Sequence, residues 1–136
     1  MNIDDLVADF EFLDDWEDRY RYVIELGKSL KPFPEEARTE ANKVQGCTSQ
    51  VWLVCSRKET PDGVFLEFLG DSDAHIVRGL VAVLLFLVSG RTPKEILDMD
   101  ILDIFRQIGL EGHLTPQRSN GLRSMVERIR AFAEAG

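Results

Sequence analysis

"QVWLVCSRKETPDGVFLEFLGDSDAHIVRGLVAVLLFLVSG", residues 50–90, decides the fold, because it changes from strand patterns to a helical pattern along its length. Residues 50–57 and 64–70 are rich in β-branched and aromatic side chains, and the turn-forming sequence TPDG at 60–63 separates them. These two runs predict a β-hairpin. The apolar run at 79–88 covers only about half of the ~20 residues that a membrane-spanning helix needs. It therefore predicts a buried core helix rather than a membrane span.

Helical patterns precede and follow this stretch. Residues 3–13 and 15–30 predict two helices, the second with one apolar face made by Tyr20, Val23, Ile24 and Gly27. Further helices are expected from residue 73 to a cap at Gly90, and then at 92–99, 100–109 and 115–136. The last set contains two Thr-Pro pairs, which are typical of helix starts. The order predicts an α+β fold, in which a small antiparallel sheet packs against helices in a single domain, 1–136.

The composition is that of a folded, acidic protein. Charged residues make up 29% and apolar residues 44%, which argues against both disorder and a fibrous repeat. The net charge of −8 is uneven: residues 1–41 carry 12 acidic and 5 basic side chains, and residues 42–136 carry 12 and 11. Such a chain repels a phosphate backbone, so we expect no nucleic-acid binding. The acidic end either faces a basic partner or forms a solvated surface.

The N-terminal sequence MNIDDLVADF has no basic region followed by an apolar run, so it does not predict a secretory signal. The expected compartment is the cytoplasm. The two cysteines stand eight residues apart, which is neither a disulfide framework nor the spacing of a redox or zinc motif.

The two cysteines are expected to differ. Cys55 shares a strand face with Val51 and Leu53, which predicts a small residue packed in the core. Cys47 precedes the strand, and residues 43–46 before it are suited to a third short strand. Cys47 would then lie at the tip of a tight reversal, where its thiol is either functional or buried by chance.

Two other chemistries use the same residues. A zinc site would combine Cys47, Cys55, His75 and His113, although no pair of them has ligand spacing. A cysteine hydrolase would pair Cys47 with one of the two histidines, although the sequence contains no oxyanion motif. The segment at 71–73, Asp-Ser-Asp, is explained by capping of the following helix. The helix start also offers positive potential that would lower the pKa of a nearby thiol.

Three motifs in register resemble the SufE family of sulfur-acceptor proteins, which includes the paralogue CsdE. They are VQGCTSQVWLV, GDSDAHIVRGL and HLTPQRSNGL, and DWEDRYRYVIELG in the N-terminal region fits the same family. The resemblance covers nearly the whole chain. It implies a compact α+β domain shared with IscU-type scaffold proteins.

The resemblance implies an accessory protein rather than a self-contained enzyme. In this family the cysteine of the motif accepts sulfur from the persulfide of a PLP-dependent cysteine desulfurase (SufS/CsdA-type), stimulates that enzyme, and passes the sulfur to an iron–sulfur scaffold. Cys47 matches that cysteine, in an acceptor loop with Gly46, Thr48, Ser49 and Gln50. No cofactor or metal is implied for this chain.

The same resemblance places a docking surface for the desulfurase beside the acceptor loop. The residues implied are Asp71, Asp73, His113 and Arg118. The alternatives are a self-contained cysteine enzyme and a metal-binding scaffold. The sequence leaves open whether the protein is a monomer or a weak homodimer, and whether it is SufE or CsdE.

Overall fold

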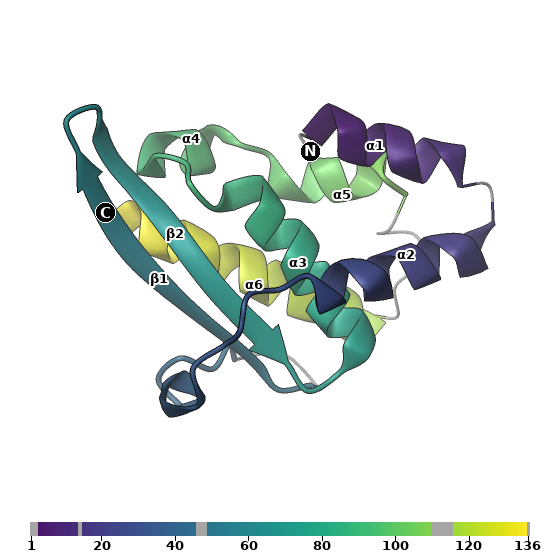
Figure 1. Ribbon diagram of the computed structural model, residues 1–136, viewed down its shortest axis with the longest axis horizontal. Helices are drawn as coiled ribbons and strands as arrows, with labels where there is room; N and C mark the ends of the chain where they lie inside the picture. Colours follow the sequence, from purple (N-terminus) through teal and green to yellow (C-terminus); the bar gives the residue numbers. More distant parts are fainter. Residues whose placement is uncertain (1–2, 14, 46–48, 110–115, 136) are drawn as a thin grey trace.

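The computed structural model describes residues 3–13, 15–45, 49–109 and 116–135 (Figure 1). Its elements, in chain order, are α1 (Ile3–Phe12), α2 (Trp16–Lys28), the 3-10 turn η1 (Glu35–Ala37), β1 (Val51–Thr60), β2 (Gly63–Ser72), α3 (His75–Val88), α4 (Pro93–Asp98), α5 (Ile101–Gln107) and α6 (Pro116–Ala135). The expected α+β architecture is confirmed. Within these described ranges, no helix has both the length and the apolar character required to cross a membrane.

The predicted hairpin is present, and its strands are longer than the apolar runs suggested. β1 and β2 pair antiparallel over ten residues each, with Val51 opposite Ser72 at one end and Thr60 opposite Gly63 at the other. The two-residue turn between them requires a positive φ of 131° at Gly63, which glycine adopts without strain. The hydroxyl of Thr60 donates to the carbonyl of Gly63 at 3.0 Å and closes the turn.

One face of the hairpin packs on the helices. Figure 1 shows α3 beside β2 and α6 passing behind the hairpin. Leu53, Leu66 and Phe68 are buried on this face, and the ring of Phe68 meets that of Phe132 on α6 edge to face. The alternation of strand side chains thus supplies one wall of the core.

α3 forms the centre of the core, as its apolar sequence predicts. Eleven of its fourteen residues are buried, and it packs closely against α2. The approach is closest at Gly79, where an added Cβ would lie 2.2 Å from the carbonyl oxygen of Val23. The apolar face predicted for α2 is the one in contact, because its buried residues are Val23 and Gly27.

Local signals place several helix ends correctly. Thr92 caps α4 in a reciprocal capping box with Glu95, and Pro93 occupies the first helical position. Gly90 follows the end of α3 with a φ of 80°, as the expected cap requires. Thr115 of the other Thr-Pro pair lies outside the described residues.

Candidate functional site

The described residues include both flanks of the predicted acceptor loop but not its centre. Gly46, Cys47 and Thr48 lie outside the described residues, and so does His113. The other expected site residues are described: Gln50 and Asp73 are exposed, and Ser49, Asp71 and Arg118 are half-buried.

The first flank pairs with the start of β1. The amide of Val44 donates to the carbonyl of Val51 at 2.8 Å, and the amide of Leu53 donates to the carbonyl of Asn42 at 2.9 Å. Lys43 and Trp52 form an antiparallel bridge between these bonds. The expected pairing of residues 43–46 is thus confirmed at its beginning, where it forms a bridge rather than a full strand. The two ends of the segment 45–50 are therefore held side by side.

The second flank is fixed at Gln50 by the end of β2. The carbonyl of Gln50 accepts from the hydroxyl of Ser72 at 2.7 Å and from the amide of Asp73 at 3.2 Å. Its amide donates to the carboxylate of Asp73 at 3.0 Å. The backbone of the last loop residue before β1 consequently makes three hydrogen bonds to two consecutive residues.

This arrangement corrects the capping role expected for Asp71, Ser72 and Asp73. The N-cap of α3 is Ala74, which makes no side-chain capping bond. Asp73 and Ser72 are bound to Gln50 instead, and Ser72 also accepts the amide of Ala74 at 3.3 Å. The side chains of Ser72 and Asp73, which the local sequence predicts to cap α3, therefore form hydrogen bonds to the backbone of the distant residue Gln50.

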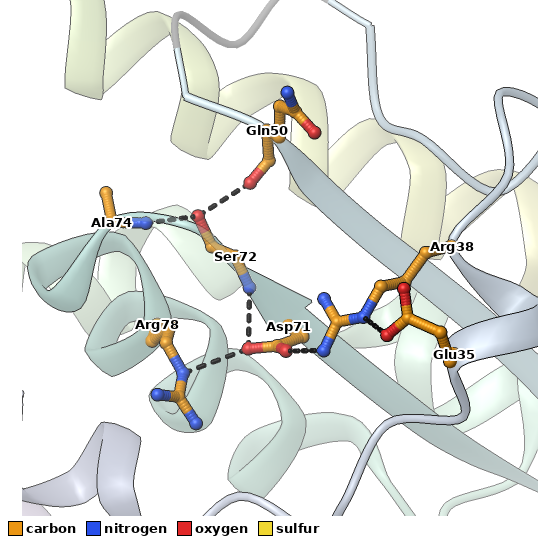
Figure 2. A network of polar contacts seen from close by, with 7 residues as sticks. All are labelled: Glu35, Arg38, Gln50, Asp71, Ser72, Ala74 and Arg78. Carbon is orange, nitrogen blue, oxygen red and sulfur yellow. Dashed lines mark hydrogen bonds and ion pairs between the residues drawn. The ribbon is translucent and has the colours of Figure 1, made fainter.

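Asp71 lies between two arginines (Figure 2). Its carboxylate contacts Nη2 of Arg38 at 2.5 Å and Nε of Arg78 at 2.9 Å, and it accepts the amide of Ser72 at 2.8 Å. The Asp71 side chain is only 13% exposed. Its charge is therefore matched inside the protein by Arg38, directly after η1, and by Arg78 on α3. The predicted docking role of Asp71 remains a prediction.

Arg38 is held by stacking as well as by charge. Its guanidinium lies 5.0 Å from the ring centroid of Trp52 and 5.4 Å from that of Phe33, and it contacts Glu35 at 3.1 Å. The hydrogen bond to Asp71 is the main cause that raises the pKa of Arg38 above its ordinary value. Arg38, which follows η1 and precedes the acceptor loop, is thus connected through Trp52 to β1, the strand after that loop.

Cys55 is less enclosed than the strand pattern predicts. Val51 and Leu53 on the same strand face are fully buried, whereas Cys55 is half-buried at the edge of the core, opposite Phe68. Burial raises the pKa of the Cys55 thiol, and the nearby charge of Arg57 opposes that increase in part. Packing against the core is confirmed, and the full burial expected from the pattern is not.

The described residues contain no group of three histidine, cysteine or acidic side chains placed to hold a metal ion. His75, exposed at the first turn of α3, belongs to the zinc and hydrolase hypotheses, which also need Cys47. A cavity of about 260 Å³ lies beside the first flank, lined by Val44, Gln45, Ser124, Glu127 and Arg128.

Sequence reasoning did not identify Arg38, Arg78 and Arg128 as parts of this region. Arg38 stands 33 positions before Asp71, and Arg128 donates to the carbonyl of Ala41 across 87 positions at 2.6 Å. No local spacing carries such information, because only the tertiary fold brings these groups together.

The chain is similar to known proteins over nearly its whole length. The family described as "SufE: Fe-S metabolism associated domain" matches residues 4–133. An uncharacterised SufE-like protein of Rhizobium meliloti (strain 1021) is 58% identical over 133 residues, which cover 98% of this chain and 95% of the relative. An uncharacterised SufE-like protein of Rhizobium etli is also 58% identical over 133 residues, with 98% of this chain and 90% of that protein covered.

Proposed function

Because the chain belongs to the SufE family, we propose that it accepts sulfur on Cys47 from a PLP-dependent cysteine desulfurase and delivers it to an iron–sulfur cluster assembly scaffold. The family match confirms the resemblance carried by the three motifs, and it assigns the chain a role in iron–sulfur metabolism. Within that role the protein acts as an accessory carrier in the cytoplasm that also stimulates the desulfurase.

The observation that supports this proposal is the fixation of both loop flanks. Val44 is hydrogen-bonded to Val51, and Gln50, the last residue of the segment 45–50, is hydrogen-bonded to Ser72 and Asp73, so this six-residue segment is anchored at both ends. Cys47 belongs to this short segment. A thiol on a short connection between two anchored points suits transfer between proteins, because few residues separate the reacting atom from those points and so limit its reach.

The chemistry is thiol exchange with a persulfide. The Cys47 thiolate attacks the outer sulfur of the desulfurase persulfide, a new S–S bond forms, and the donor cysteine leaves as a thiolate. No net oxidation takes place, since sulfane sulfur moves from one thiolate to another. The protein needs an accessible thiolate and close docking, and the reaction draws on no cofactor from this chain.

We propose that the docking rim includes Asp73 and Arg118, both from motifs of the family resemblance. Asp73 is exposed next to the Gln50 anchor, so its carboxylate lies beside the end of residues 45–50, which we call the acceptor segment. His113 retains its predicted docking role. For Asp71, enclosed by Arg38 and Arg78, any effect on docking is expected to be indirect.

The first prediction separates the two cysteines. Cys47→Ser should abolish both sulfur acceptance and stimulation of the desulfurase, because serine cannot form a persulfide. Cys55→Ser should retain both activities. The measurement is intact-protein mass after incubation with desulfurase and cysteine, where one added sulfur atom that a reductant removes marks the carrier.

Sulfur acceptance by the Cys47→Ser protein would refute the proposal. Stoichiometric metal in the purified protein, together with no sulfur adduct on the wild type, would instead favour a metal-binding scaffold. Turnover of a substrate without any desulfurase would favour a cysteine enzyme.

A further inference from the structure

A chain of polar contacts leads from the two arginines to the acceptor segment (Figure 2). One carboxylate oxygen of Asp71 accepts a hydrogen bond from Arg38. The other accepts the amide of Ser72 and forms an ion pair at 2.9 Å with Nε of Arg78, which makes no hydrogen bond of its own within the described residues. The hydroxyl of Ser72 then donates to the carbonyl of Gln50 at 2.7 Å. Four separate segments of the chain meet in this network.

The network is enclosed at its centre. Ser72 is 5% exposed and the Asp71 side chain is 13% exposed. Polar groups at such burial are costly to leave unpaired, so the contacts restrain one another. Arg38 adds a further restraint, because its stacking on Trp52 fixes the direction from which it reaches the carboxylate.

We infer that Asp71 is a positioning residue for the acceptor segment, and that it acts through Ser72 rather than by contact with a partner. The inference rests on the proposed function, since it concerns the segment that carries Cys47. Asp71 fixes the end of β2 relative to Arg38, which follows η1, and to Arg78 on α3. Ser72, placed in this way, holds the carbonyl of Gln50, and the amide of Gln50 is held in turn by Asp73.

The two readings of Asp71 predict different measurements. If Asp71 is a docking residue, its substitution changes the affinity for the desulfurase and leaves the free protein unaltered. If Asp71 is a positioning residue, its substitution changes the free protein: the amides of Gln50 and Asp73 exchange their hydrogens faster, and the reactivity of Cys47 changes without any partner present. Affinity is then altered less than the rate of sulfur acceptance.

The test uses Asp71→Asn, Ser72→Ala and the double variant in the full chain without partner. Alkylation of Cys47 is followed by peptide mass spectrometry, which separates it from Cys55. We expect each single variant to alter the alkylation rate by about fivefold, the change in loop population that a hydrogen bond of about 1 kcal/mol permits. The double variant should match Ser72→Ala alone, because both substitutions break the same chain of contacts.

A matched control accounts for general loss of stability. Ile96→Val removes one methyl group from a fully buried side chain on α4, outside the network. It should lower the melting temperature and leave the alkylation rate of Cys47 and the exchange at Gln50 unchanged. Titration with the desulfurase then gives the dissociation constant and the rate of sulfur acceptance for each variant.

Three results would overturn the inference. The first is an Asp71→Asn protein that alkylates at the wild-type rate but binds the desulfurase more weakly, which is the behaviour of a docking residue. The second is a double variant whose effect is the product of the two single effects. The third is a rate that follows the melting temperature in all variants, Ile96→Val included. Failure of the wild type to take up sulfur would refute the proposed function alone, because alkylation and hydrogen exchange are measured without a partner.

Discussion

At the scale of a single residue, surroundings decide what a cysteine does. Cys55 lies on the hairpin at the edge of the core, and burial raises the pKa of its thiol. Because only the thiolate is nucleophilic, a raised pKa leaves little reactive form at neutral pH. Under the proposed function, an unreactive Cys55 leaves Cys47 as the thiol that accepts sulfur.

This gives a prediction for the pH dependence of Cys55 alkylation in a Cys47→Ser background. The rate should rise with pH through a midpoint above the ordinary value of a cysteine. Arg57→Gln should move that midpoint further up, since the Arg57 charge opposes the effect of burial. A midpoint at or below the value in the urea-unfolded chain would contradict this reading. The same shift makes the free energy of unfolding depend on pH. Because the pKa of Cys55 is higher in the folded chain than in the unfolded chain, its contribution to stability is complete below the unfolded pKa and is lost as pH rises through the folded pKa.

At the scale of elements, local signals succeed where the partners are local. The capping box of Thr92 and Glu95 joins residues three positions apart, so the sequence predicts it correctly. The Asp-Ser-Asp segment at 71–73 carries an equally good cap signal, yet none of the three caps α3. Those side chains instead contact Arg38, Arg78 and Gln50. The positions of these three partners depend on how the elements of the fold pack together. Propensity cannot rank partners that only the fold supplies.

The contact of α2 with α3 leads to a prediction for Gly79→Ala. An added Cβ at Gly79 would lie 2.2 Å from the backbone carbonyl of Val23, so the two helices must separate. We expect a loss of about 3 kcal/mol or more in the free energy of unfolding, at the upper end of what overpacking costs. Urea denaturation measures it. Gly27→Ala should cost less, because its Cβ would meet the backbone of α3 at 2.8 Å.

Glu127→Ala provides the control for Gly79→Ala, since Glu127 is exposed on α6 and loses atoms rather than gaining them. Its midpoint in urea should remain close to that of the wild type. If Gly79→Ala also unfolded at the wild-type midpoint, the close approach of the two helices would not be a constraint on the fold.

For the molecule as a whole, the two ends of the hairpin differ in the segments that they contact. The end with Val51 and Ser72 carries both flanks of the acceptor segment, whereas the turn at Gly63 lies at the other end. α3 lies beside β2 and α6 passes behind the hairpin, so the core helices pack on one face of the hairpin (Figure 1). Sequence patterns predicted the hairpin and the core helix, whereas the role of Cys47 comes from the family resemblance and stays a prediction. The anchoring of Gln50 could not be predicted, because its partners Ser72 and Asp73 stand 22 and 23 positions further along the chain and only the pairing of β1 with β2 brings them together.

The last prediction concerns the two proposed docking residues, Asp73 and Arg118. Asp73→Arg and Arg118→Ala should each change desulfurase binding or stimulation several-fold, and the effect should depend on salt, because rim charges act mainly on association. Asp73→Asn separates two roles of Asp73: it removes the charge but retains an oxygen that can accept the amide of Gln50. A charge effect appears in both Asp73 variants, whereas an anchoring effect appears in Asp73→Arg alone.

Asp98→Arg applies the same charge reversal on α4 and should leave the titration unchanged. Each variant is titrated against desulfurase activity and melted in parallel. Unchanged titration curves for Asp73→Arg and Arg118→Ala, or losses that follow unfolding, would place the docking surface elsewhere.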